Sequence, residues 1–113
     1  QMSPFITKEQ EEVIMPLLPH CSAGRWCPVF ADVIAASNGK EKGIDEIINY
    51  FGFSLDETMS FGDGGNDISM LHHAAIGVAM GNAGKRVKQA ADYVTTSVDD
   101  NGIINALKYF NII

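Results

Sequence analysis

A glycine-rich acidic segment, residues 61–67 with the sequence FGDGGND, constrains the fold of this chain more than any other feature. The apolar residues 59–61 read as the end of a strand, and a helix-like segment follows directly. In an open parallel sheet, such a loop lies at the carboxyl end of a strand, where ligands of these folds bind. The two adjacent glycines let the backbone approach a ligand closely, while Asp63 and Asp67 supply hard oxygen atoms suited to Mg²⁺. The segment therefore indicates a metal and phosphate site.

The chain around this segment alternates short strands with helices. Strands are predicted at 58–62, 76–80 and 92–95, and helices at 66–74, 84–90 and from about 103 onward. Upstream, apolar residues at helical spacing predict an amphipathic helix over 44–51, after a polar loop at 37–43 and before a terminating Gly52. This alternation is typical of an α/β fold, a parallel sheet with helices on its faces.

The first 36 residues follow a different rhythm. Thr7 and Gln10 fit a capping box, so a helix should begin there and end near Met15, because Pro16 lacks the N–H that a continuing helix needs. Strands are predicted at 2–6, 21–26 and 29–36. The sequence therefore predicts two parts, an α+β segment over 1–36 and the α/β part over 37–113.

The composition excludes several classes of function. The chain has 113 residues and a formal net charge of −6, and its eight Lys and Arg residues are scattered, which argues against a nucleic-acid partner or an anionic membrane surface. It has no apolar run near the roughly 20 residues that span a bilayer and no signal core at its start, so a cytoplasmic location is expected. Cys21 and Cys27 lack a CxxC spacing, and reduced thiols are expected.

Two sequence blocks carry a family resemblance: GDGGNDISML at 62–71 and AAIGVAMGNA at 74–83. With further matches through residue 103, the chain resembles the haloacid dehalogenase (HAD) superfamily, and more closely its Cof-type sugar-phosphate phosphatases. The resemblance covers nearly all of the chain after residue 37. It implies the C-terminal part of a Rossmann-like core, while residues 1–36 resemble the closing part of the α/β cap of this subgroup.

The resemblance also implies a reaction. In the family, an aspartate nucleophile attacks the phosphoryl group of a small phosphorylated metabolite, here a sugar phosphate, and water hydrolyses the aspartyl-phosphate with Mg²⁺ bound. The nucleophile belongs to an Asp-x-Asp motif near the start of the core, and this sequence contains no Asp-x-Asp. We therefore expect the chain to be the C-terminal portion of a longer protein and to be inactive alone.

By position in the family motifs, Asp63 matches the Mg²⁺ ligand and Asn66 an amide that helps hold the phosphoryl oxygens. Asp67 matches the second acid, a catalytic group that supports the site. The basic residue of the family precedes the core helix. Lys42 fits it best as a catalytic and phosphate-binding group, with Lys40 as the alternative, because a lysine here offsets the negative charge of phosphate and carboxylates.

Simpler interpretations stand beside these assignments. Asp63 and Asp67 could only cap a helix, and Lys42 could be a solvated surface lysine. Arg25 and Trp26, in the cap-like part, could meet a sugar phosphate, but a tryptophan packed in a small cap core is equally consistent with the sequence.

At the level of function, the alternatives are a non-catalytic module that binds Mg²⁺ or phosphate, a scaffold, and the phosphorylation domain of a P-type ATPase. Pumps of that class carry a similar block but usually continue with Ala-Pro, where this chain has Ile68 and Ser69. The sequence leaves open whether a homodimer or strand exchange covers an exposed side of the sheet, because an uncovered parallel sheet promotes association.

Overall fold

The chain divides into two compact units, Gln1–Gly39 and Lys40–Ile113. The structure is a computed structural model that describes residues 2–113, with only the backbone of Trp26. The division falls three residues after the junction at 36/37 that the sequence suggested. We call the two parts the N-terminal unit and the C-terminal unit and describe each by itself.

The N-terminal unit contains α1 (Lys8–Ile14), β1 (Cys21–Cys27) and β2 (Phe30–Ala35). The capping box at the start of α1 is confirmed: the Gln10 N–H donates to Thr7 Oγ1 at 3.3 Å, and the Thr7 N–H donates to Gln10 Oε1 at 2.9 Å. A 3-10 turn that includes Pro16 then ends the helix as predicted.

Strands β1 and β2 form an antiparallel pair whose register shifts between Gly24 and Cys27. Ala31 and Val33 of β2 are buried and form the small core of this unit. The strand predicted at 2–6 is reduced to a single bridge between Met2 and Val33. Pro4 explains the loss, because a residue without an N–H cannot extend a strand ladder.

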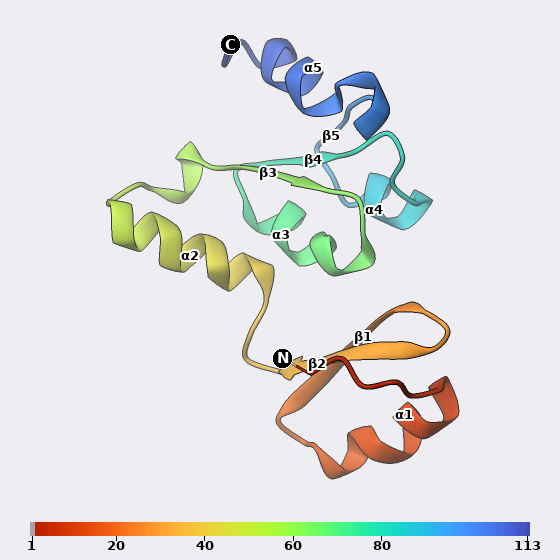
Figure 1. The fold of residues 1–113 in the computed structure, drawn as a ribbon. Helices are drawn as coiled ribbons and strands as arrows, with labels where there is room; N and C mark the ends of the chain where they lie inside the picture. Colours follow the sequence, from red (N-terminus) through yellow and green to blue (C-terminus); the bar gives the residue numbers. More distant parts are fainter. Residues whose placement is uncertain (1) are drawn as a thin grey trace. The chain divides into compact units, whose positions relative to one another are not determined.

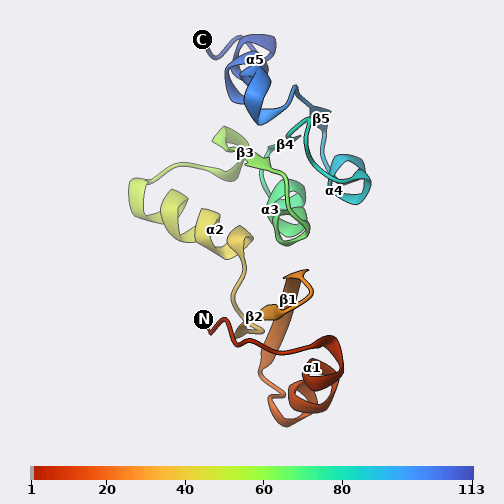
Figure 2. The ribbon, with the colours of Figure 1, turned by 45° about the vertical axis from the view of Figure 1, so that its right-hand side comes forward.

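The C-terminal unit has the predicted α/β alternation. Its elements are α2 (Lys40–Phe51), β3 (Met59–Gly62), α3 (Ile68–His73), β4 (Ile76–Ala79), α4 (Lys85–Gln89), β5 (Tyr93–Val94) and α5 (Gly102–Tyr109). The three strands form a parallel sheet in the order β3-β4-β5. Helices α3 and α4 lie on one side of this sheet and α5 on the other (Figures 1 and 2). The predicted fold class is confirmed.

The core of this unit lies between β4 and the helices α3 and α4. Its buried members are Leu71, Ala79, Ala83 and Val87. Strand and helix approach so closely that a Cβ atom on Gly77 would lie 2.2 Å from the carbonyl oxygen of Leu71. This contact holds α3 directly beneath the strand and so fixes the helix that follows the acidic loop.

Helix α2 begins earlier than predicted. Lys40, Glu41 and Lys42 were assigned to the polar loop 37–43, but they form the first turn of the helix. Lysine and glutamate are good helix formers, and their preference outweighs the cost of Gly43. The end is as predicted: Gly52 has a φ of 75°, and the next N–H, of Phe53, closes a Schellman-type bond to the Ile48 carbonyl at 2.9 Å. No helix within residues 2–113 is both long and apolar enough to cross a bilayer.

Candidate phosphoryl-transfer site

Asp67 organises the acidic loop from inside. It is only 4% exposed, and its Oδ2 accepts hydrogen bonds from the backbone N–H groups of Asp63 at 3.0 Å and Gly64 at 2.9 Å. Its Oδ1 accepts a hydrogen bond from Nζ of Lys40. Both carboxylate oxygens are therefore engaged within the chain. Asp67 shapes the loop through the two backbone N–H groups and holds the ammonium group of Lys40 beside it.

Gly62, the last residue of β3, makes this burial possible. A Cβ atom at position 62 would lie 2.5 Å from Cβ of Asp67 and 3.1 Å from its Oδ2. Carbon atoms do not approach this closely, so any side chain here would push Asp67 away. The glycine is required by close approach and not by an unusual backbone conformation.

The electrostatics of Asp67 reflect two opposed effects. Burial alone disfavours the charged form and raises the pKa of this carboxyl group. The hydrogen bond from Lys40, the N–H groups of Gly64 and Asp63, and the positive charge of Lys40 outweigh burial, so the pKa of Asp67 lies below its ordinary value. Asp67 is thus held ionised, as a partner for a cation requires.

Asp63 lies at the surface of the C-terminal unit, directly after β3. The residue is exposed, and its Oδ2 accepts a hydrogen bond from Nδ2 of Asn82 at 3.1 Å. Asn82 follows β4, and because β3 and β4 are parallel, the loops after both strands meet at the same edge of the sheet. Asn66 is also exposed, next to Asp67 in the same turn. The predicted acids and amide therefore lie together at the carboxyl end of β3.

The two candidate lysines behave differently. Lys40, the alternative in the sequence, is the lysine whose amine contacts Asp67, and its side chain remains 48% exposed. Lys42 is exposed two residues later, which is about 200° around an α-helix from Lys40, and within residues 2–113 no ion pair joins it to Asp67. The structure thus brings Lys40, and not Lys42, to the acidic loop.

Helix α2 holds Lys40 in place through polar contacts with α3. Oγ of Ser69 donates to a carboxylate oxygen of Glu41 at 2.7 Å, and Nε2 of His73 lies 2.6 Å from Oδ1 of Asp45. The Ser69 hydroxyl is the main reason that the pKa of Glu41 lies below its ordinary value. Together with the bond from Lys40 to Asp67, these contacts line up one face of α2 against the segment that carries the acids.

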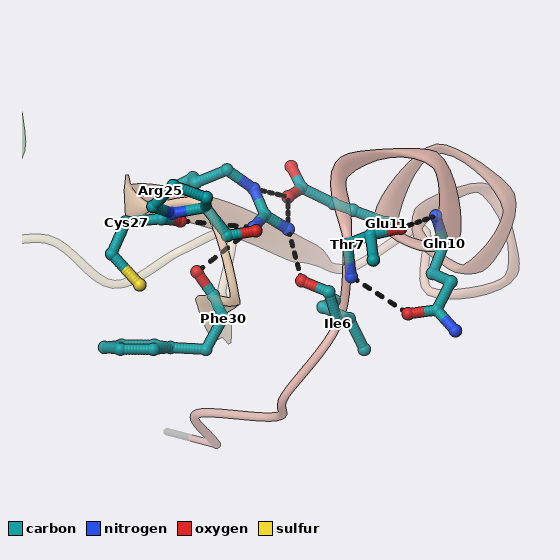
Figure 3. A network of polar contacts seen from close by, with 8 residues as sticks. Ile6, Thr7, Gln10, Glu11, Arg25, Cys27 and Phe30 are labelled. Atoms are coloured by element: carbon teal, nitrogen blue, oxygen red, sulfur yellow. Dashed lines mark hydrogen bonds and ion pairs between the residues drawn. The ribbon is translucent and has the colours of Figure 1, made fainter.

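Arg25 has a structural role in the N-terminal unit. Its guanidinium group pairs with Glu11 at 2.6 Å and donates to four backbone carbonyl oxygens at 3.0 to 3.3 Å (Figure 3). These carbonyls belong to Ile6, Cys27, Pro28 and Phe30. An arginine so engaged has little capacity left for a phosphate. The side chain of Trp26, the other cap candidate, lies outside the described part of the structure.

The donor set fits Mg²⁺ as one contribution to a larger shell. Asp63 offers an exposed carboxylate, the ligand type that Mg²⁺ prefers, whereas both oxygens of Asp67 are already engaged. Among the residues that the structure describes, no group of three or more His, Cys, Asp or Glu side chains could hold a metal ion. A magnesium ion at Asp63 would therefore complete its coordination with water, phosphate oxygens or groups from outside these residues.

A family model described as haloacid dehalogenase-like hydrolase matches residues 5–107. The chain belongs to this family. The structure described as the HAD subclass IIB sugar phosphatase BT4131 matches with a TM-score of 0.90 and 63% sequence identity, over 98% of this chain and 43% of that chain. BT1666 from Bacteroides thetaiotaomicron, described among the phosphatases of the HAD superfamily, matches with a TM-score of 0.93 and 47% identity, over 98% and 41% of the two chains.

Two similar proteins of Bacillus subtilis have names that describe phosphatases. YkrA of Bacillus subtilis is 36% identical over 106 residues, which are 94% of this chain and 41% of YkrA. The 5-amino-6-(5-phospho-D-ribitylamino)uracil phosphatase YcsE of the same organism is 35% identical over 83 residues, or 74% and 33% of the two chains. This HAD-family chain thus spans about two fifths or less of the length of these relatives.

Asn82 is a site residue that is not among those predicted from the sequence. It lies in the tight connection between β4 and α4, and its side chain contacts Asp63. The signal was available: a polar side chain directly after a strand that neighbours β3 in a parallel sheet lies at the edge where Asp63 lies.

Proposed function

We propose that this HAD-family chain supplies part of the site of a Mg²⁺-dependent phosphatase that hydrolyses phosphate monoesters of small metabolites, sugar phosphates in particular. The observation that carries the proposal is the exposed residue Asp63 beside the pair of buried Asp67 and half-exposed Lys40 at the carboxyl end of β3. The likeness to BT4131, a sugar phosphatase, supports the substrate class.

Each residue has a distinct part in this proposal. Asp63 would hold Mg²⁺, which would neutralise charge on the phosphoryl group and orient it. Lys40, fixed by Asp67 yet half exposed, offers its remaining N–H donors and positive charge to the phosphoryl oxygens. Asn66 offers an amide donor from the same turn. We assign the role of the family's basic residue to Lys40, because its amine reaches the acidic loop.

The nucleophile is not part of the chain. An aspartyl-phosphate route needs an aspartate aimed at phosphorus, the sequence has no Asp-x-Asp, and Asp67 is committed to Lys40 and to the loop. We therefore propose that the remaining protein supplies this aspartate and that residues 1–113 alone do not turn over phosphate monoesters. Turnover of a sugar phosphate or p-nitrophenyl phosphate by the purified chain would overturn this point if Asp63→Asn abolishes it, because activity from a contaminating enzyme would not depend on Asp63.

A magnesium titration followed by ¹⁵N NMR tests the metal half of the proposal. We expect shifts confined to residues 62–67, and we expect Asp63→Asn to remove them. Asp56→Asn is the matched control, since Asp56 precedes β3 and therefore lies toward the amino end of that strand, whereas Asp63 lies at its carboxyl end. No shift at millimolar Mg²⁺ would favour the alternative of a non-catalytic scaffold.

Association through the sheet is proposed as a further property. Strand β3 stands at the edge of the described three-stranded sheet, and an open edge can pair with another chain. Sedimentation velocity across a hundredfold concentration range measures this. A dimer that Met59→Pro weakens would support pairing at β3, while a strictly monomeric chain would reject it.

A further inference from the structure

Asn82 bridges two loops at the carboxyl edge of the sheet. Its Nδ2 donates to Oδ2 of Asp63 at 3.1 Å, and its Oδ1 accepts from the N–H of Val98 at 3.1 Å. Asp63 follows β3, Asn82 follows β4 and Val98 lies beyond β5. One amide group therefore links the segments after all three strands.

The contact with Val98 decides which way the amide faces. A backbone N–H can only donate, so the oxygen of the Asn82 side chain must face Val98. The nitrogen must then face Asp63, where it can only donate to the carboxylate. The orientation of the amide is thus set by hydrogen-bonding chemistry, and Asp63 always meets a donor.

The backbone beside Asn82 is fixed as well. The N–H of Gly81 donates to the carbonyl of Thr96 at 2.9 Å, and a Cβ atom on Gly81 would lie 2.5 Å from the backbone nitrogen of Ser97. On the other side, Ala83 is buried in the core. Asn82 therefore projects from a backbone that is held before and after it, which lets a single hydrogen bond restrict its partner.

We propose that Asn82 is the positioning residue for Asp63: it holds Oδ2 of that carboxylate and leaves Oδ1 to the cation. This inference rests on the proposed function, because Asp63 needs a fixed direction only if it binds a metal. Mutation of a residue that orients a metal-ligating carboxylate commonly weakens metal affinity by 10-fold or more. Asn82 acts through Asp63 and does not itself contact metal or phosphate.

The competing explanation is that Asn82 only ties two loops together. Asn105 provides the control, because its Nδ2 donates to Oγ1 of Thr96 at 2.8 Å and to the carbonyl of Asp100 at 2.9 Å. It ties the loop after β5 as Asn82 does, and neither of these bonds involves Asp63. Asn105→Ala therefore removes loop contacts without removing the donor to the carboxylate.

The first experiment needs no metal. Three-bond couplings around the Cα–Cβ bond of Asp63 report whether its side chain keeps one rotamer. We expect one rotamer in the unmodified chain and in Asn105→Ala, and averaging in Asn82→Ala. Asn82→Asp should also disturb the Asp63 rotamer, because it keeps an acceptor for Val98 but faces Asp63 with a second carboxylate. A single unchanged rotamer in both Asn82 variants, or equal averaging in Asn105→Ala, would overturn the inference.

A direct measurement covers the case in which Asn82→Ala does not fold. In the otherwise unmodified chain, Asp63→Ala should shift the side-chain NH₂ resonances of Asn82, while Asp56→Ala should not. Unmoved resonances in Asp63→Ala contradict the hydrogen bond itself.

Magnesium chloride then separates this inference from the proposed function. If the unmodified chain binds Mg²⁺ at 62–67, Asn82→Ala should weaken binding about 10-fold and Asn105→Ala less than twofold. Equal affinity in Asn82→Ala rejects a positioning role. If the unmodified chain binds no Mg²⁺, the metal half of the proposed function fails, and the rotamer measurement alone decides whether Asn82 orients Asp63.

Discussion

Two cations, Arg25 in the N-terminal unit and Lys40 in the C-terminal unit, each pair with a carboxylate, but they leave very different amounts of capacity for a ligand. Arg25 is 18% exposed at its side chain and has five acceptors within the chain. Lys40 is 48% exposed and contacts one carboxylate oxygen of Asp67. A cation engaged on every side stabilises a fold, whereas a cation held at one point can also meet a phosphate.

Removing Arg25 should have the largest effect. Arg25→Ala removes one ion pair with Glu11 and the hydrogen bonds from Arg25 to four carbonyl groups, so we expect the N-terminal unit to lose about 3 kcal/mol of stability. Arg25→Lys keeps the positive charge but lacks the planar guanidinium group with its five N–H donors. It should therefore be more stable than Arg25→Ala and less stable than the unmodified chain. Hydrogen exchange of β1 and β2 amides measures the change. Unchanged protection in Arg25→Ala would show that Arg25 is not structural and would reopen it as a phosphate ligand.

Crowding Asp67 should come next. Gly62→Ala introduces a methyl group 2.5 Å from Cβ of Asp67, and we expect it to destabilise the C-terminal unit by about 2 kcal/mol. Gly65→Ala is the control, because a Cβ at position 65 meets nothing within 4 Å. Urea unfolding followed at the amides of β4 compares the two. Equal midpoints for both variants would contradict the close packing of the loop.

The ionisation of Asp67 predicts a smaller, pH-dependent effect. Because the folded-state pKa lies below that of the unfolded chain, at about 3.9, Asp67 stabilises the fold fully above about pH 5. This stabilisation is lost as the pH falls through the folded-state pKa. Asp67→Asn should therefore be less stable than the unmodified chain at pH 7 and approach it in acid. A difference in unfolding free energy that stays constant from pH 7 to pH 3 argues against the pair with Lys40.

The lysines should show the smallest change in stability. Lys40 is half exposed, so Lys40→Ala should cost only about 0.5 kcal/mol, and Lys42→Ala about zero. Their effect on ligands separates them: only Lys40→Ala should weaken the response of residues 62–67 to inorganic phosphate in the presence of Mg²⁺. A larger loss in Lys42→Ala would restore the assignment that the sequence favoured.

Several predictions that depended on neighbouring residues agree with the structure. The Thr7 capping box, the helix end at Gly52 and the alternation of strands and helices are all written in local sequence, and each is found. The direction of each side chain around a helix is harder to predict, because it depends on the residue at which the helix begins. The predicted start of α2 at residue 44 is four residues late and left the direction of each lysine undetermined, since two residues along a helix change direction by about 200°.

Contacts between distant segments were harder to predict. Asn82 and Asp63 are 19 residues apart and meet because parallel strands bring their loops to one edge. Arg25 lies where the register of β1 and β2 shifts, and its carbonyl partners depend on that irregular backbone. Neither contact is marked by a sequence spacing of its own: the first depends on the order of strands in the sheet, and the second on the path of the irregular backbone.

The contacts between α2 and α3 have an evolutionary consequence. Helix α2 contains no fully buried residue, so pairwise polar contacts such as Glu41 with Ser69 and Asp45 with His73 fix its alignment. A substitution at one member of such a pair removes the partner of the other, whereas apolar packing tolerates exchange at one position. Among homologous sequences, positions 41 and 69, and positions 45 and 73, should therefore covary.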